Sequence, residues 1–375
     1  MIGMFQRLAL PVALSLTLSP LSIAQAPTEN TADSAPAAYT PHEGDFVIHD
    51  FHFQSGETMP EVRLHYTTFG APVKDAHGHT TNAVLILHGT SGSGKQFLRS
   101  IFEGELFGPG QPLDAAKYYL VLPDNIGHGK SSKPSDGLHA RFPHYDYADM
   151  VALQHELLAK GLGVDHLRLV MGTSMGCMHS FMWGEDYPDE MDALMPLACL
   201  PVQIAGRNRV WRKMIIDGIY NDPDWKNGEY KTQPRAALEI SADFLAIASS
   251  APLRMQRDLP TANAADLFVD STVKRMASEI DINDFLYAVN ASRDYDPSAK
   301  LGLIQAPLML VNSADDFINP PELGIAEREI VHVKKGKYIL LPASEKTHGH
   351  GTHTMAAVWK KHLEELLDES TPKSQ

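Results

Sequence analysis

The feature that most constrains the fold is the pentapeptide GTSMG at Gly172–Gly176. It follows the apolar run 166–171, which is typical of a strand buried on both faces, and it leads into a second apolar stretch that begins at Cys177. The pattern G-x-S-x-G between a strand and a helix predicts a sharp turn that exposes the serine hydroxyl. Small residues at both ends of the turn let neighbouring backbones approach closely. We therefore expect a strand–turn–helix unit around Ser174 and not an ordinary glycine-flanked loop.

The rest of the chain repeats this alternation of strand and helix. Short apolar runs typical of buried strands occur at 83–87, 118–122, 193–197, 308–312 and 337–341. Helical spacing of apolar residues predicts helices at 147–158 and 355–366, and an antiparallel hairpin is expected at 45–53 and 61–69. Alternating strands and helices imply a parallel sheet with right-handed crossovers.

The alternation stops between residues 201 and 299, where segments such as 235–248 and 265–280 have a helical pattern. This change predicts a helical cap over 201–299. The cap is inserted into a sheet domain that we expect to comprise residues 45–200 and 300–370.

The first 26 residues carry the features of a secretory signal peptide. Arg7 precedes the apolar stretch Leu8–Ile23, and Ala24–Ala26 matches an A-x-A cleavage site. Two prolines interrupt the apolar stretch, which argues against a membrane anchor, since a span needs ~20 apolar residues. Residues 27–44 are rich in Ala, Thr, Pro and Ser and are expected to form a disordered leader. The mature protein is expected to be periplasmic or secreted.

Charge and cysteine content exclude several classes of partner. The chain has 32 Lys and Arg against 46 Asp and Glu, and its net charge of -14 repels nucleic acid and anionic lipid surfaces. No nucleic acid and no membrane partner is therefore expected. Two cysteines, Cys177 and Cys199, are too few for a disulfide scaffold or a cysteine-based zinc site. We expect both to be small buried residues with free thiols, and a single disulfide is the alternative.

Ser174 needs a base to take its proton, and the base needs an acid to orient it. The chain offers both downstream, in the order serine, acid, histidine. Asp315 and Asp316 follow the predicted strand 308–312. Asp316 is favoured because it lies four residues before Pro320, as in the turn that usually follows this strand.

The candidate base follows the predicted strand 337–341. His350 is favoured because it lies between two glycines that let its loop approach the serine, whereas His353 is expected at the start of the terminal helix. With His348 these residues form an H-x-H-x-x-H pattern, which resembles a metal-binding tract. Because the order of the triad is satisfied, no metal site is expected.

The tetrahedral intermediate of such a reaction needs two backbone N–H donors. One is expected from Met175, the residue after the nucleophile, and the other from Thr90 or Ser91 in the loop after the third predicted strand. The same loop, Gly89–Lys95, matches the phosphate-binding pattern G-x-x-x-x-G-K. The next residue is Gln96 instead of the Ser or Thr that binds Mg²⁺, so a nucleotide site is not expected.

Several motifs resemble the homoserine O-acetyltransferases. They are Gly172–Gly176 with Met178, Trp183 and Tyr187-Pro188, the cap segment from Arg207 to Tyr230, and the segment 281–296. The similarity covers most of residues 45–367. It implies the α/β-hydrolase fold with an inserted cap, a triad of Ser174, Asp316 and His350, and an acyl-serine intermediate.

The chain departs from that family in one segment. The acyltransferases normally carry an arginine before the aspartate that matches Asp281, and here Glu279 and Ile280 stand there instead. The segment Asp124–Ser132 is also more similar to homoserine-acetyltransferase-like hydrolases than to the biosynthetic enzyme.

We therefore expect an exported serine hydrolase that cleaves an ester or similar acyl compound without a cofactor. The alternatives are an O-acyltransferase and a non-catalytic binding protein on the same fold, which an intact triad disfavours. The expected partner is a small-molecule acyl substrate, and a homodimer is left open. Arg209 and Arg212, together with Arg207, are candidates for binding a substrate carboxylate. Internally paired or solvated arginines are the alternative.

Overall fold

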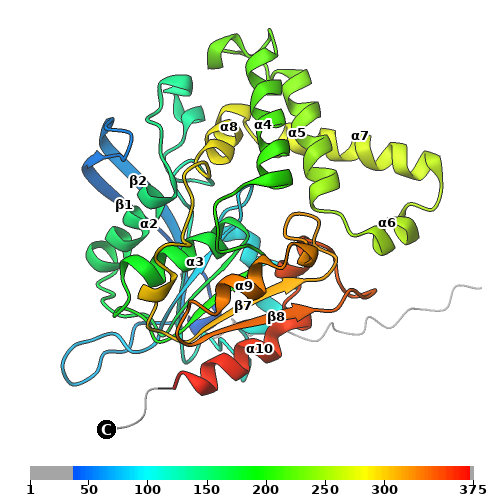
Figure 1. The fold of residues 1–375 in the computed structure, drawn as a ribbon. Coiled ribbons are helices and arrows are strands. Elements are labelled where there is room, and N and C mark those ends of the chain that lie inside the picture. Colours follow the sequence, from blue (N-terminus) through cyan, green and yellow to red (C-terminus); the bar gives the residue numbers. More distant parts are fainter. Residues whose placement is uncertain (1–36, 372–375) are drawn as a thin grey trace, which may run out of the picture. The chain divides into compact units, whose positions relative to one another are not determined.

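The structure is a computed structural model that describes residues 37–371 (Figure 1). The predicted signal peptide and residues 27–36 of the predicted leader lie outside the described residues. Residues 42–44, which were expected to be part of the leader, are folded, because strand β1 begins at His42, where the backbone pairs with Thr68. Composition did not reveal this start, since the long-range strand pairing that orders residues 42–44 leaves no local pattern.

An eight-stranded sheet has the order β1-β2-β4-β3-β5-β6-β7-β8. Its strands are β1 (His42–His52), β2 (Thr58–Phe69), β3 (Ala83–Leu87), β4 (Tyr119–Pro123), β5 (Leu169–Thr173), β6 (Leu194–Leu197), β7 (Leu308–Ser313) and β8 (Gly336–Leu341). β1 and β2 form the predicted antiparallel hairpin, β2 also pairs antiparallel with β4, and the other neighbours are parallel. The predicted mostly parallel α/β sheet is confirmed. β5 runs to Thr173, so Ser174 follows the strand directly.

Helices cover both faces of the sheet, and the strand side chains show why. On β3, Leu85 and Leu87 pack in one hydrophobic cluster with α2 (Tyr147–Glu156), α3 (Met175–Asp186) and α9 (Ile325–Ile330). Val84 and Ile86 pack in a second cluster with α1 (Glu103–Leu106) and α10 (Ala356–Glu369). Successive side chains of a strand point to opposite faces, so burial on both faces requires an entirely apolar run.

The chain between β6 and β7 forms cap helices α4 (Gly206–Asn221), α5 (Arg235–Ala248), α6 (Pro252–Asp258), α7 (Ala262–Glu279) and α8 (Ile282–Asn290) (Figure 1). α4, α5, α7 and α8 share a hydrophobic core of their own, which includes Trp211, Leu238 and Phe285, whereas no residue of α6 is buried. α7 begins three residues before the expected position because the Thr261 hydroxyl caps the helix by accepting from the Ala264 N–H at 3.2 Å.

Shorter helical turns join these elements. They are 3-10 helices at Ala37–Tyr39, Gly94–Leu98, Pro134–Asp136, His139–Arg141, Lys226–Gly228, Leu301–Leu303, Pro321–Leu323 and Gly351–Thr354, and a π-helical turn at Leu157–Gly161. Within residues 37–371 no single helix has the length and apolar composition of a membrane span. Helices α5 and α6 have that length and composition only when they are taken together, and they are bent by 110° relative to each other.

The prediction of free thiols is wrong, because a disulfide joins Cys177 to Cys199. Both residues are buried, as expected, and their Cα atoms are 5.8 Å apart. The physical reason lies in the sheet order. β5 and β6 are parallel neighbours, so the start of α3 after β5 lies beside the chain that leaves β6. A separation of 22 residues hides this proximity in the sequence.

We predict that removal of this disulfide destabilises the protein. Replacing both cysteines by serine frees the unfolded chain from one cross-link, which typically lowers the free energy of unfolding by about 2–4 kcal/mol. Thermal unfolding of the two proteins with and without a reducing agent is the measurement. The unmodified protein should lose several degrees in Tm on reduction, and the double variant should not respond. An unmodified protein with the same Tm under both conditions would contradict the prediction.

Helix α3 also carries a buried carboxyl group, that of Glu185. Its Oε1 atom has no hydrogen-bond partner among residues 37–371. Burial, assisted by the neighbouring Asp186 carboxylate, raises the pKa of Glu185 to about 8. A glutamate in an unfolded chain has a pKa near ~4.3, so unfolding between these two pH values releases a proton. The free energy of unfolding therefore falls as the pH rises from the lower value to the upper one.

We predict that Glu185→Gln stabilises the protein in a pH-dependent way. The amide keeps the shape of the protonated carboxyl group and cannot ionise, so its advantage should emerge above pH ~5 and grow until pH ~8. Thermal unfolding across this pH range measures the difference. Glu364→Gln on the exposed side of α10 is the matched control and should change little at any pH. Parallel curves for Glu185→Gln and the unmodified protein would refute the ionisation argument.

Candidate active site

The turn at Ser174 connects β5 to α3 and has an unusual backbone conformation. Ser174 has φ 54° and ψ -106°, in a region that side chains other than glycine rarely adopt. The flanking glycines make the turn possible. A Cβ at Gly172 would collide with the Gly176 carbonyl, and a Cβ at Gly176 would collide with the Leu87 carbonyl on β3. The turn therefore fixes the Ser174 hydroxyl at the carboxyl ends of the central strands.

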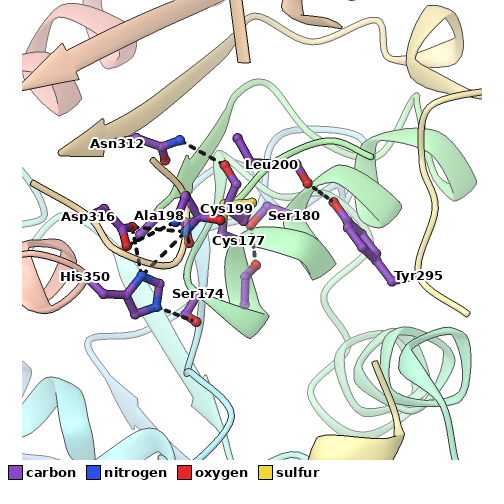
Figure 2. Close-up of a disulfide and its surroundings, with 12 residues drawn as sticks. Ser174, Cys177, Ser180, Ala198, Cys199, Leu200, Tyr295, Asn312, Asp316 and His350 are labelled. Carbon is purple, nitrogen blue, oxygen red and sulfur yellow. Dashed lines mark hydrogen bonds and ion pairs between the residues drawn. A yellow bond between two sulfur atoms is a disulfide. The ribbon is translucent and has the colours of Figure 1, made fainter. Parts of the chain in front are cut away.

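The structure brings together the three side chains that the sequence favours. The Ser174 Oγ lies 2.8 Å from His350 Nε2, and His350 Nδ1 lies 2.9 Å from Asp316 Oδ2 (Figure 2). An ionised carboxylate only accepts hydrogen bonds, so Nδ1 carries the proton. Nε2 is then free to accept the proton of the Ser174 hydroxyl. This is the arrangement that a serine nucleophile requires.

Asp316 and Asp315 have different partners. Asp316 is almost completely buried, and burial alone would raise its pKa, but the adjacent His350 and the hydrogen bonds from Asn319 outweigh that effect. The pKa of Asp316 therefore lies below its usual value, and the carboxylate stays ionised. Asp315 instead accepts from the Ser313 hydroxyl and from Thr347 Oγ1, the latter at 2.8 Å. Asp315 thereby joins the loop after β7 to the loop that carries His350.

Sequence reasoning missed Asn319. Its side-chain amide donates to Asp316 Oδ2 and to the Ala198 carbonyl, each at 3.0 Å, and so fixes the acid against the chain after β6. The only available signal was an asparagine one residue before Pro320 in the turn that carries the two aspartates.

We predict that Asp316→Asn lowers kcat by about 10³–10⁴-fold, because an amide cannot hold the histidine in the required tautomer. The same change at Asp315 should lower kcat by no more than about tenfold, because the amide oxygen still accepts a hydrogen bond from Thr347. Turnover of a nitrophenyl ester by the two adjacent variants is the comparison. A larger loss at Asp315 would reverse the assignment.

The three histidines of the H-x-H-x-x-H pattern have different surroundings. The ring of His348 accepts from the Arg254 guanidinium of α6, while the ring of His350 lies between Ser174 and Asp316. His353 lies in the 3-10 turn Gly351–Thr354, just before α10 and not on it as expected. Burial lowers the pKa of His353 to about 3, so its ring is neutral, and it packs edge-on against His350 at 5.1 Å.

Met175 and Thr90 have the backbone N–H groups expected to form the oxyanion hole. Neither N–H has a hydrogen-bond partner among the described residues. Met175 opens α3, and the loop of Thr90 approaches the nucleophile so closely that a Cβ on Gly89 would lie 3.6 Å from the Ser174 Cβ. Both groups are thus available to a negative oxygen near Ser174.

Two buried histidines that the sequence did not single out hold this loop. Burial lowers the pKa of His88 well below its usual value, so the ring is neutral. Its Nδ1–H donates to the Gly89 carbonyl at 2.8 Å, and that carbonyl belongs to the peptide group that carries the Thr90 N–H. The His128 Nε2 lies 2.8 Å from the Thr90 carbonyl and fixes the next peptide, which carries the Ser91 N–H. The two rings therefore set the direction of both candidate donors.

The apparent phosphate-binding pattern at Gly89–Lys95 supports the turn at Ser174. Gln96 Nε2 donates to Thr173 Oγ1 at 2.8 Å, directly before Ser174. The Gly94 N–H, which a phosphate-binding loop would offer to its ligand, donates to Asp124 Oδ1 at 2.7 Å. An internal carboxylate thus occupies the anion position.

A cavity of about 840 Å³ opens beside Ser174 and His350, between the cap and the loops after β6 and β7. Arg212 is one of the lining residues and is buried, and its guanidinium donates to Asn208 Oδ1 at 2.9 Å and Ser292 Oγ at 3.1 Å. Arg207 also lines the cavity, whereas Arg209 is not among the lining residues. The structure thus separates the two predicted substrate-binding arginines, with Arg212 at the cavity and Arg209 away from it.

Comparison with known proteins agrees with this geometry. A family model described as alpha/beta hydrolase fold matches residues 82–342. A probable acyltransferase from Methanothermobacter thermautotrophicus is 31% identical over 78% of this chain and 86% of its own length. A homoserine O-acetyltransferase from Pelobacter propionicus is 29% identical over 79% of this chain and 87% of its own length. The solved structure of the acetyl esterase MekB matches with a TM-score of 0.74 and 25% identity, over 89% of this chain and 100% of that one.

Proposed function

The chain belongs to the α/β hydrolase fold family, in its homoserine O-acetyltransferase-like branch, and we propose that it is an exported serine hydrolase. Enzymes of this branch are hydrolases or acyltransferases, as the esterase and acyltransferase relatives illustrate. The proposed substrate is an ester or similar acyl compound, and the proposed intermediate is an acyl group on Ser174. The observation that carries the proposal is the hydrogen-bonded chain from Ser174 through His350 to Asp316 beside an open cavity.

In the proposed reaction, His350 Nε2 takes the proton of Ser174 as its Oγ attacks the acyl carbon. The N–H groups of Met175 and Thr90 donate to the oxygen that becomes negative. The bond to the leaving alcohol then breaks, and His350 returns the proton to that alcohol. A water molecule repeats the attack on the acyl-serine, again through His350, and releases the free acid. Asp316 holds the Nδ1–H of the histidine throughout.

Export is part of the proposal because the N-terminal residues have the features of a signal peptide. The disulfide between Cys177 and Cys199 supports it, since disulfides persist in oxidising compartments. An exported enzyme meets abundant water and has no supply of acetyl-CoA, which favours hydrolysis as the second half-reaction. If the exported protein still carried residues 1–26, this part of the proposal would be contradicted.

The charges around the cavity also favour a simple ester over a phosphate-bearing donor. The lining includes the cations Arg207 and Arg212 and the carboxylates Asp315, Asp316 and Glu322. Arg207 already lies over the Phe317 ring, 3.8 Å from its centre. A donor such as acetyl-CoA carries several negative phosphate groups, which proteins usually bind with clusters of cations. The three carboxylates of the lining would repel these phosphate groups.

Arg212 is the proposed polar contact for the substrate. Its side chain is only 3% exposed and forms no ion pair among the described residues, so a carboxylate or carbonyl oxygen of the substrate would gain a strong hydrogen bond there. Arg209, the other predicted contact, would act only through the position of helix α4. Arg212→Lys should therefore raise KM more than Arg209→Lys does.

We predict that water outcompetes homoserine for the acyl-serine. The mature protein is supplied with a nitrophenyl acetate and millimolar homoserine, and free acetate and O-acetylhomoserine are quantified. Most of the acetyl group should appear as free acetate. Ser174→Ala is the control and should lower the formation of both products by about 10³-fold or more, because the triad acts as a unit. A second arm supplies acetyl-CoA in place of the nitrophenyl ester, and efficient transfer from it to homoserine in preference to water would overturn the hydrolase assignment.

A further inference from the structure

The cavity beside Ser174 is much larger than an acetyl ester needs. Its volume of about 840 Å³ is in the range of pockets that enclose ligands of drug size, about 300–1,000 Å³. Most of the side chains that line it are apolar, and they include Met178, Leu200, Val202, Ile204, Ile318 and Ile325. Met178 lies one helical turn after Ser174, so the apolar lining begins at the nucleophile itself.

The apolar lining continues to the surface. Leu253 of α6 and Leu323 after β7 also line the cavity, and they are 64% and 52% exposed. The lining also includes charged residues, among them Arg207, Asp315 and Glu322, but the apolar side chains outnumber them and include both Met178, near Ser174, and these two exposed leucines. Exposing these leucine side chains to water is unfavourable in free energy, and contact with an apolar ligand would remove that penalty.

We infer that the substrate carries an apolar arm of about five or more carbons, which occupies this cavity beside the reacting ester bond. This inference rests on the proposed acyl-serine function. It concerns the part of the substrate that does not react. The arm belongs either to the acyl group or to the alcohol. The apolar lining would bind an aliphatic chain from either side of the ester in the same way.

The expected size of the effect follows from hydrophobic burial. Each methylene buried in an apolar site should raise kcat/KM by about fourfold, which corresponds to about 0.8 kcal/mol per group. Extending an arm from two to six carbons should therefore raise kcat/KM by about 10²-fold, until the arm reaches the exposed leucines.

The test uses two series of esters with the mature protein, both below the concentration at which they form micelles. Nitrophenyl esters from acetate to decanoate lengthen the acyl arm, and alkyl acetates from ethyl to decyl lengthen the alcohol arm. A gain of about 10²-fold in either series supports the inference and assigns the arm to that side.

A matched pair of variants locates the effect. Val202 lines the cavity, so Val202→Trp fills part of its volume. Val210→Trp makes the same change on α4, at a position that is 58% exposed and not among the lining residues. Val202→Trp should lower kcat/KM for the six-carbon ester by more than about tenfold and alter the acetate ester by less than about threefold. Val210→Trp should alter neither. Labelling of Ser174 by a fluorophosphonate confirms that each variant is folded.

The outcomes separate this inference from the proposed function. If acetate esters are hydrolysed but neither series shows a gain with length, or if Val202→Trp leaves the gain intact, the apolar arm is refuted and the hydrolase proposal stands. If no ester is hydrolysed and Ser174 is not labelled, the proposed function fails, and the inference fails with it.

Discussion

The turn at Ser174 is the constraint on which the rest of the site depends. Its positive φ is a conformation that costs ~1–3 kcal/mol for a residue with a side chain, and it persists only because surrounding contacts hold it. Those contacts need glycine at 172 and 176, where any side chain would collide with a backbone carbonyl. Once the turn is fixed, the parallel strands determine which other loops reach the same edge. The loop after β3 brings Thr90, the loop after β7 brings Asp316, and the loop after β8 brings His350.

A closed chain of covalent and hydrogen bonds runs through Ser174, and Figure 2 shows the disulfide, Ala198, Asp316 and His350 within it. The disulfide links Cys177 on α3 to Cys199, the next residue after Ala198. The Ala198 carbonyl accepts from Asn319, which also donates to Asp316, and the chain returns through His350 to Ser174. The disulfide therefore has a positional role beyond its effect on unfolding. It holds the segment after β6 against helix α3, which begins directly after Ser174. The positions of Ser174 and Asp316 are therefore fixed relative to the same segment.

Sequence patterns predicted the elements with strong local signals and missed contacts between distant loops. Short apolar runs, typical of strands buried on both faces, located the parallel strands of the sheet. The order of serine, acid and histidine followed from the residues after β5, β7 and β8. Composition could not distinguish a free cysteine pair from the disulfide, because the proximity of Cys177 to Cys199 is created by strand pairing. His88 and Asn319 were missed for a similar reason, since each acts through a carbonyl in another loop or an adjacent peptide. The start of β1 at His42 likewise depends on pairing with β2.

The most direct test of the central claim, that Ser174 carries the acyl group, is to stop the enzyme during turnover and locate the acyl mass. The mature protein is mixed with a slowly hydrolysed ester, quenched in acid and digested, and its peptides are weighed by mass spectrometry. The acyl mass should appear on the peptide that contains Ser174, and it should disappear from Ser174→Ala together with turnover. An acyl mass on another residue, or continued turnover by Ser174→Ala, would contradict the claim.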